Sequence, residues 1–251
     1  MEWTDEAIVL GVRKHGETSV IAELMTRDHG RHLGLIQGGR SRRLRPVLQP
    51  GNSVTVHWRA RLDEHLGQFK VEPEKLRAAQ LMEHAHAIYA LQTLASHLRL
   101  LPERDAHEGL YHTLAIVLDH LDAPDIAAEL VVRFELAMLE ELGFGLDLAA
   151  CAATGSRQNL VYVSPKTGRA VSGEAGQPWA DRMLMLPSFL LERDIERIDS
   201  ASLEDIQAGF ELTRYFFWRN IHGPRGIDIP PERESLLRAV TKVLSEGMTD
   251  E

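Results

Sequence analysis

This 251-residue chain has one cysteine, Cys151, and no apolar run of 18 residues or more. A single cysteine cannot form an internal disulfide, and alone it cannot build a zinc site of the four-thiolate kind. Without a long apolar run the sequence predicts no transmembrane helix. Residues 1–6 are acidic where a signal peptide would be basic, so we expect a cytoplasmic, nucleoid-associated protein.

Motifs of the common enzyme classes are also missing. The chain has no nucleophile elbow, no P-loop and no glycine fingerprint of a dinucleotide-binding fold. Of its 12 histidines, the nearest approach to a zinc-protease motif is at 107–112, with three residues between the glutamate and the second histidine where two are required. His84 and His86 are two positions apart and are expected to diverge on a helix. We therefore predict no catalytic residue, no metal and no cofactor.

Positive charge is concentrated in one stretch, from Thr26 to Arg61. It contains eight arginines and one acid, a local balance of +7 in a chain of net charge −9. Such segregation is typical of a face that meets a polyanion, and the Gly38-Gly39 pair lets a phosphate approach the backbone closely. The alternative is a solvated surface loop. The eight candidates are Arg27, Arg31, Arg40, Arg42, Arg43, Arg45, Arg59 and Arg61.

The residue pattern of the first 73 positions is typical of short β-strands separated by turns. Five strands in about 70 residues suit a small barrel, either an OB-fold, which commonly binds single-stranded nucleic acid, or an SH3-like barrel. Trp58 and Phe69 either offer faces on which bases stack or belong to the core. The predicted strands are 7–13, 19–25, 32–36, 54–58 and 66–71.

From residue 74 onward, apolar residues at three- and four-residue spacing predict a helical domain. The fold class is therefore α+β, with domains 1–73 and 74–251 and a small insertion at 151–178. Asp125 is a possible N-terminal cap, and Ser202 with Asp205 resembles a capping box. Gly223-Pro224 is expected to end a helix, and the tail 247–251 is expected to fray. The predicted helices are 75–101, 106–121, 126–142, 184–191, 202–221 and one from Pro230-Pro231, with a hairpin formed by 160–163 and 168–171.

Several separated motifs resemble the RecO family, the recombination-mediator proteins of bacterial DNA repair. Their order and spacing cover most of residues 7–190, and the C-terminal third matches more loosely. The motifs are 7–10, 16–19, 26–31, Gly38-Gly39-Arg40-Ser41, Leu48-Gln49-Pro50-Gly51, Arg133-Phe134-Glu135-Leu136, Leu142-Gly143-Phe144, and Cys151 followed by 161–168.

The resemblance implies an N-terminal OB-fold, a helical domain and a non-enzymatic function. RecO-like proteins bind single- and double-stranded DNA and anneal complementary strands. They contact the acidic C-terminal tail of single-strand-binding protein and, with RecR, help load RecA onto coated DNA. Many carry a four-cysteine zinc module, from which this chain departs: Cys151 stands at the first cysteine position, but Thr154, Ser172 and Ala175 stand where further cysteines belong. We predict a degenerate, metal-free hairpin there.

The resemblance also suggests roles for the basic residues. The eight arginines are predicted to contact DNA phosphates, with Arg27 and Arg31 the two that instead have neighbouring acids as possible partners. Arg133, in an otherwise apolar helix, is predicted to hold a carboxylate of the partner tail, or else to form an internal salt bridge. Two other functional classes are the alternatives. One is a protein adaptor whose barrel binds a protein or another polyanion and not DNA. The other is a hydrolase or nuclease, which requires clustered carboxylates and a divalent metal, and the sequence shows no such cluster.

Overall fold

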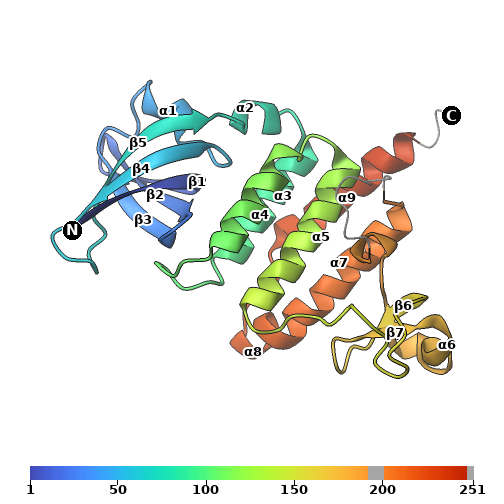
Figure 1. Ribbon diagram of the computed structural model, residues 1–251. Helices are drawn as coiled ribbons and strands as arrows, with labels where there is room; N and C mark the ends of the chain where they lie inside the picture. The colour runs from blue at the N-terminus through green and yellow to red at the C-terminus, as the bar shows by residue number, and fades with distance from the viewer. Residues whose placement is uncertain (192–200, 248–251) are drawn as a thin grey trace. The chain divides into compact units, whose positions relative to one another are not determined.

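The computed structural model describes residues 1–191 and 201–247 of the chain (Figure 1). The chain divides into two units, with the boundary between Asp122 and Ala123. The predicted domain boundary after residue 73 falls inside the last barrel strand, and three helices that follow it belong to the first unit.

The N-terminal strands close into a five-stranded barrel in the order β1-β2-β3-β5-β4. This confirms the predicted barrel of OB type and the α+β class. Each predicted strand is present. The first four are longer than predicted at one or both ends, while the fifth begins two residues later and ends four residues later than predicted. The strands are β1 (Glu2–His15), β2 (Ser19–Thr26), β3 (Gly30–Ile36), β4 (Ser53–Arg59) and β5 (Gln68–Lys75).

The barrel closes because β1 is long enough to pair with two neighbours. Its first half pairs with β4 and its second half with β2, and a register shift between Val9 and Gly11 bends it around the core. The seam between β3 and β5 is short: Leu35 pairs with Gln68, and the Leu35 amide donates to the carbonyl of Gly67 at 3.1 Å.

Alternating residues of all five strands fill the barrel with aliphatic and aromatic side chains. Trp58 and Phe69 are 1% and 3% exposed, so they belong to the core and offer no stacking face. Inside the basic loop a short helix, α1 (Leu44–Val47), adds Val47, with Leu48 after it, to this core. The loop is therefore anchored on apolar residues while its arginines face outward.

Three helices complete the first unit: α2 (Ala78–Leu81), α3 (Ala85–Leu98) and α4 (Glu108–Asp119). The single helix expected over 75–101 is wrong, since the chain leaves helical geometry before α3. His84 is extended (φ −121°, ψ 120°), and its ring stacks on His86 with centroids 5.4 Å apart. The expected divergence of these two rings is therefore also wrong, because His84 precedes the helix.

Ion pairs fasten these helices to the barrel within the first unit. Glu23 on β2 accepts from Arg31 at 3.0 Å and from Arg99, at the end of α3, at 2.9 Å. Arg77 is buried, donates to the Ser53 hydroxyl at 2.7 Å and pairs with Asp119 at the end of α4. These contacts explain why α2–α4 fall in the same unit as the barrel.

The turn between β2 and β3 sets a strict requirement at Gly30. Its φ is +65°, and a Cβ there would lie 1.7 Å from the carbonyl oxygen of Asp105. Gly16 has nearly the same φ, +62°, but a Cβ there meets no atom within 4 Å. We expect Gly16→Ala to destabilise the protein by about 1 kcal/mol through backbone strain alone. Gly30→Ala should be worse by a further 1–3 kcal/mol or so, because it also forces the α3–α4 connection away. Urea denaturation of both variants measures the difference, and equal losses would show that the close approach has no energetic weight.

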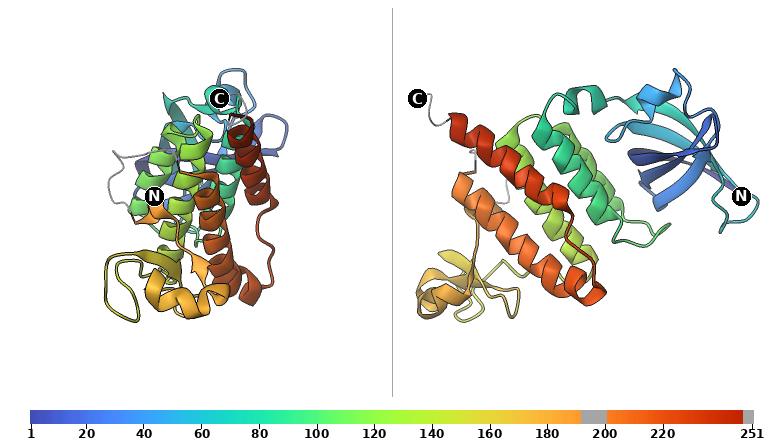
Figure 2. Two further views of the ribbon diagram at one scale, coloured as in Figure 1. Left: turned by 90° about the vertical axis from the view of Figure 1, so that its right-hand side faces the viewer. Right: turned by 180° about the vertical axis from the view of Figure 1, so that it is seen from behind.

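The second unit contains three long helices, α5 (Pro124–Glu141), α7 (Leu203–Phe217) and α9 (Pro231–Gly247), which lie side by side (Figure 2). The predicted hairpin is confirmed and gains a third strand, giving the order β7-β6-β8. The smaller elements are β6 (Leu160–Val163), β7 (Ala170–Ser172), α6 (Gly173–Gly176), η1 (Gln177–Arg182), β8 (Leu184–Met185), η2 (Ser188–Leu190), η3 (Trp218–His222) and α8 (Gly223–Arg225).

Several predicted helix boundaries need correction. The helix expected at 184–191 is wrong, since β8 and the 3-10 turn η2 occupy that stretch. Asp125 is not a cap: Ala123 caps α5 and Pro124 begins it. Gly223-Pro224 does not end the helical path, because Pro224 is accepted in the first turn of α8 and Gly226, at φ 63°, ends it. Of the tail expected to fray, Gly247 ends α9 and 248–251 lie outside the described residues.

Ser202 caps α7 as predicted, but Asp205 does not complete the capping box. The Ser202 hydroxyl accepts from the Asp205 amide at 3.1 Å. In a capping box the acidic side chain would turn back to the cap residue, but the Asp205 carboxylate accepts instead from the Ser188 hydroxyl at 2.7 Å. The start of α7 is thereby tied to η2.

A fully buried ion pair joins the three long helices. Glu135 of α5 is 0% exposed and accepts from Arg233 of α9 through both carboxylate oxygens, at 2.7 and 2.9 Å. Arg233 also donates to the Thr213 hydroxyl at 2.7 Å and to the Phe210 carbonyl at 2.6 Å, both on α7. Because the guanidinium of an α9 residue contacts both α5 and α7, the pair fixes how the three helices pack.

Candidate nucleic-acid interface

A hollow of about 1430 Å³ runs along the barrel surface between α1, β4 and β5. Three cations line it, each from a different element: Arg43 before α1, Arg59 at the end of β4 and Lys70 on β5. Two acids, Glu2 and Glu72, also line it, so its charge is positive by a margin of one. The hollow is partly open to solvent.

A second hollow of about 790 Å³ continues the first toward the β4–β5 loop. The two share Arg59 and Gln68, and the second adds Arg61 and His65. A third arginine, Arg104, supports this loop from behind: its guanidinium donates to the carbonyls of Asp63 and His65, the latter at 2.8 Å. We name the two hollows together the barrel groove, a trough with Arg43, Arg59, Arg61 and Lys70 along it.

The four arginines of the basic loop are all exposed. The Arg40 guanidinium donates to the Glu17 carbonyl at 2.5 Å, a contact that orients the side chain without neutralising it. Within the described part of the chain, Arg42, Arg43 and Arg45 form no ion pair, and neither do Arg59 and Arg61 in the groove. Six of the eight candidate arginines are therefore open to an external anion.

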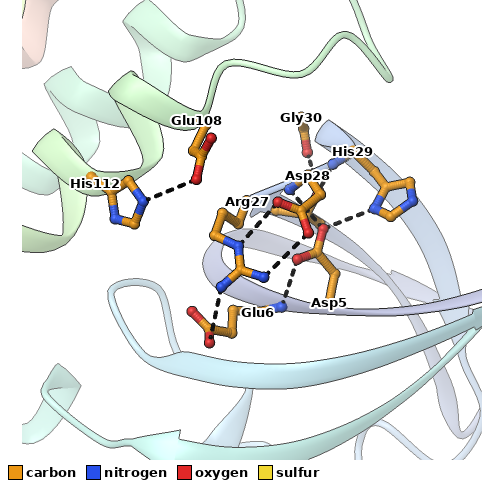
Figure 3. Close-up of polar contacts among 9 residues, drawn as sticks. Asp5, Glu6, Arg27, Asp28, His29, Gly30, Glu108 and His112 are labelled. Carbon is orange, nitrogen blue, oxygen red and sulfur yellow. Dashed lines mark hydrogen bonds and ion pairs between the residues drawn. The ribbon is translucent and has the colours of Figure 1, made fainter.

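Arg27 is occupied by carboxylates of its own surroundings, as Figure 3 shows. It donates to Asp28 at 3.0 Å and lies 3.3 Å from Glu6 on β1. The hydrogen bond with Asp28 raises the pKa of Arg27, and the same bond lowers the pKa of Asp28. Buried Asp5 holds the turn in place by accepting from the Asp28 amide at 2.9 Å and from the His29 ring at 2.8 Å.

Arg31 is more deeply engaged. Its side chain is 11% exposed, it pairs with Glu23 at 3.0 Å, and it donates to the Leu101 carbonyl at 3.3 Å. Both Arg27 and Arg31 therefore pair with nearby acids, which is the alternative that the sequence left open. The Arg31 side chain is therefore largely covered, whereas that of Arg27 is paired but still 34% exposed.

Beneath the groove lies an aromatic cluster. Trp3 is half-buried and stacks on the buried ring of Trp58, centroids 5.5 Å apart, and on His29 at 4.1 Å. His32 packs edge-on to Trp58, and burial lowers the pKa of His32 to about 4, so this ring is neutral. Sequence reasoning missed Trp3 and Lys70. Lys70 was recoverable, since it alternates with buried Phe69 in a predicted strand.

Arg133 of α5 takes part in an internal pair. Its guanidinium donates to Glu129, one turn earlier, at 2.7 Å and to the carbonyl of Phe189, over whose ring it lies 5.9 Å from the centroid. Since Glu129 is buried, this arrangement matches the internal salt bridge left open as the alternative to tail binding.

Cys151 is buried in the small insertion, where hydrogen bonds take the place of metal ligands. Its sulfur accepts from the Ser172 amide at 3.2 Å and the Ser172 hydroxyl at 3.4 Å. Burial raises the pKa of the Cys151 thiol, but the hydrogen bonds from Ser172 and Thr154 outweigh it and bring the pKa to about 6. Over residues 1–191 and 201–247, no three His, Cys, Asp or Glu side chains come together as metal ligands.

Across the same described ranges, none of the helices combines the length and apolar character that crossing a bilayer requires.

Comparison with known proteins adds the family. The model of the family described as "Recombination protein O N terminal" matches residues 1–76, and "Recombination protein O C terminal" matches residues 82–226. Proteins named DNA repair protein RecO align with nearly the whole chain. That of Mesorhizobium japonicum is 61% identical over 242 residues, 96% of this chain and 94% of its own length. That of Rhizobium johnstonii is 59% identical (98% and 94%), and that of Sinorhizobium medicae 58% (100% and 99%).

Proposed function

This chain belongs to the RecO family of DNA repair proteins, and on that premise we propose that its barrel binds single- and double-stranded DNA and anneals complementary strands. The family is one of non-enzymatic recombination mediators, and the chain is a mediator of this kind. The observation that carries the proposal is the group of six exposed arginines, none paired with a described acid. Four lie in the basic loop, where Arg43 also lines the barrel groove, and two more, Arg59 and Arg61, lie in the groove.

Arginine suits phosphate because its guanidinium stays charged and donates two parallel hydrogen bonds. Hydrogen bonds to phosphates do not distinguish one base from another, so binding should be independent of the nucleotide sequence. Arg43 and Arg59 line the first hollow, Arg59 and Arg61 the second, and Arg40, Arg42 and Arg45 extend the basic surface along the loop. Arg27 and Arg31 contribute by holding the turn and strand in place.

Annealing on such a surface requires no catalytic group. Two DNA strands repel one another through their phosphates, and a surface that neutralises both lowers that repulsion. We further propose that the chain acts on chromosomal DNA in the cytoplasm, with RecR and single-strand-binding protein as partners and RecA loading as the outcome. For the acidic tail of single-strand-binding protein, Arg133 stays the predicted contact, on the condition that the tail displaces Glu129 from its 2.7 Å pair.

The second candidate is an adaptor whose barrel groove binds a protein. The aromatic rings of the groove favour it in one respect. Trp58 and Phe69 are buried and Trp3 is half-buried, so the groove offers less ring surface for stacking than many single-strand binders do. The two candidates differ in their response to salt, because only phosphate contacts release condensed counterions.

The test is a fluorescence-anisotropy titration of a labelled single-stranded oligonucleotide over a series of salt concentrations. If all six exposed arginines contact phosphates, the slope of log K against log salt approaches roughly −4, at about −0.7 per contact. Arg27→Ala is the control, expected to change affinity less than about twofold because that guanidinium is already paired. Absent or salt-independent binding by the wild type would favour the adaptor.

A further inference from the structure

The C-terminal end of α7 carries a second basic and aromatic surface, in the other unit of the chain. We define the α7 patch as exposed residues of α7, η3 and α8 together with one lysine of the β6–β7 turn. Tyr215 is 37% exposed and Trp218 54%. The members are Lys166, Arg214, Tyr215, Trp218, Arg219 and Arg225.

The local fold explains why these residues face outward. Along α7 and the π-helical turn η3, Phe216, Phe217 and Ile221 are buried, while the residues on the other side of the helix are exposed. Arg214 and Tyr215 near the end of α7, and Trp218 and Arg219 in η3, are all exposed, so this side of the helical path carries two arginines and two aromatic side chains. π-helical turns recur at functional sites, which makes an exposed tryptophan at this one notable.

Two contacts hold the patch in shape. Gly223 approaches the turn so closely that a Cβ there would lie 2.9 Å from the Trp218 carbonyl oxygen. The Arg219 guanidinium donates to the carbonyls of Pro165 and, at 3.1 Å, Lys166, which brings the β6–β7 turn beside η3. The exposed residue Lys166 thereby lies beside Arg219. The patch is therefore a fixed surface built from two segments far apart in sequence.

Its charge is opposite to that of the unit around it. Residues 123–251 contain 13 lysines and arginines against 21 aspartates and glutamates, a formal charge of −8. The patch contains four cations, with Glu211 and Asp228 the acids nearest in sequence. A basic patch on an acidic unit suits an anionic partner. The two exposed aromatic rings suit a partner that has planar rings to stack on them.

We propose that the α7 patch is a second binding site for single-stranded nucleic acid, with bases stacked on Trp218 and Tyr215 and phosphates held by Arg214 and Lys166. Only a single strand offers unstacked bases, whereas the rings of a duplex are covered by their neighbours. An acidic peptide would require a pocket for its apolar residues, while Trp218 projects from the outside of a helical turn. This inference rests on the proposed function: two strand sites on one chain raise the effective concentration of complementary strands.

The test compares two paired variants of the full chain. Arg214→Ala/Trp218→Ala removes one cation and one ring of the patch. Trp179→Ala/Arg182→Ala is the matched control, because Trp179 is also 54% exposed and Arg182 lies over its ring at 6.0 Å. We expect the patch variant to bind one labelled oligonucleotide within about threefold of wild type but to anneal complementary strands at least tenfold more slowly, while the control variant anneals normally.

Two further measurements sharpen the result. Trp218→Phe keeps a ring for stacking and should anneal within about threefold of wild type, and ultraviolet crosslinking of a bromouracil oligonucleotide should label Trp218 or Tyr215. Equal annealing by the patch and control variants, with no crosslink at either residue, would refute the inference while leaving the barrel site intact. A patch variant that anneals normally but loses an acidic peptide would make this a protein-docking site instead. A wild type that binds no oligonucleotide would remove both proposals.

Discussion

Replacing Arg40, Arg42, Arg43 and Arg45 together by alanine is expected to lower affinity for a single-stranded oligonucleotide by at least tenfold near 0.1 M salt. All four side chains are exposed. If each contacts one phosphate, the slope of log K against log salt becomes shallower by up to about 2.8. The loop should keep its shape, since it is anchored by Val47 and Leu48 in the barrel core. Anisotropy over a salt series measures both quantities, and circular dichroism checks the fold.

The matched control removes four positive charges elsewhere on the surface. Arg13, Lys14, Arg157 and Lys242 are exposed and lie outside both the groove and the α7 patch. Their replacement by alanine changes net charge equally, so it should weaken binding only through long-range attraction, by about two- to threefold. Equal losses in the two variants would mean that overall charge, and not the loop, determines affinity. If neither variant is affected, the DNA site lies on another surface.

Arg233→Ala is expected to destabilise the second unit by about 3–5 kcal/mol, the usual effect of leaving one member of a buried ion pair alone. Glu135 would stay fully buried without Arg233, and the Phe210 carbonyl would lose its 2.6 Å hydrogen bond from the guanidinium. Amide hydrogen exchange in α5 and α7 measures the effect locally. Protons that exchange through unfolding of this unit should exchange about 10² to 10⁴ times faster.

Two comparisons show whether burial is the cause. Arg238→Ala removes an arginine of the same helix whose pair with Glu234 is exposed, and it should change stability by less than about 0.5 kcal/mol. The double variant Glu135→Leu/Arg233→Met should be more stable than Arg233→Ala, because it removes the isolated charge. A double variant no better than Arg233→Ala would argue that the hydrogen bonds to α7, and not the buried charge, stabilise the helices.

Much of the fold could be predicted because it depends on local patterns. Alternation of apolar residues placed the five barrel strands, and Ser202 capped α7 through the side chain expected of it. The errors arose where several conformations suit one sequence. Leu184 to Leu191 is apolar enough for a helix, but β8 instead pairs with β6, and Tyr162 lies opposite Met185. A strand of two residues has no sequence signature of its own, since its partner determines it.

For the candidate site, too, the sequence determined some properties and the tertiary structure determined others. The sequence by itself determined that eight arginines and one acid occupy residues 26–61, that the rest of the chain is acidic, and that one cysteine with three non-ligands cannot hold zinc. Only the tertiary structure decided which arginines are open to a ligand. Pairing of Ala7 with Thr26 in the barrel places Glu6 beside Arg27, and Glu23 is brought to Arg31 by the β2–β3 pairing. Charge is a property of each residue, whereas neutralisation depends on partners that strand register brings together.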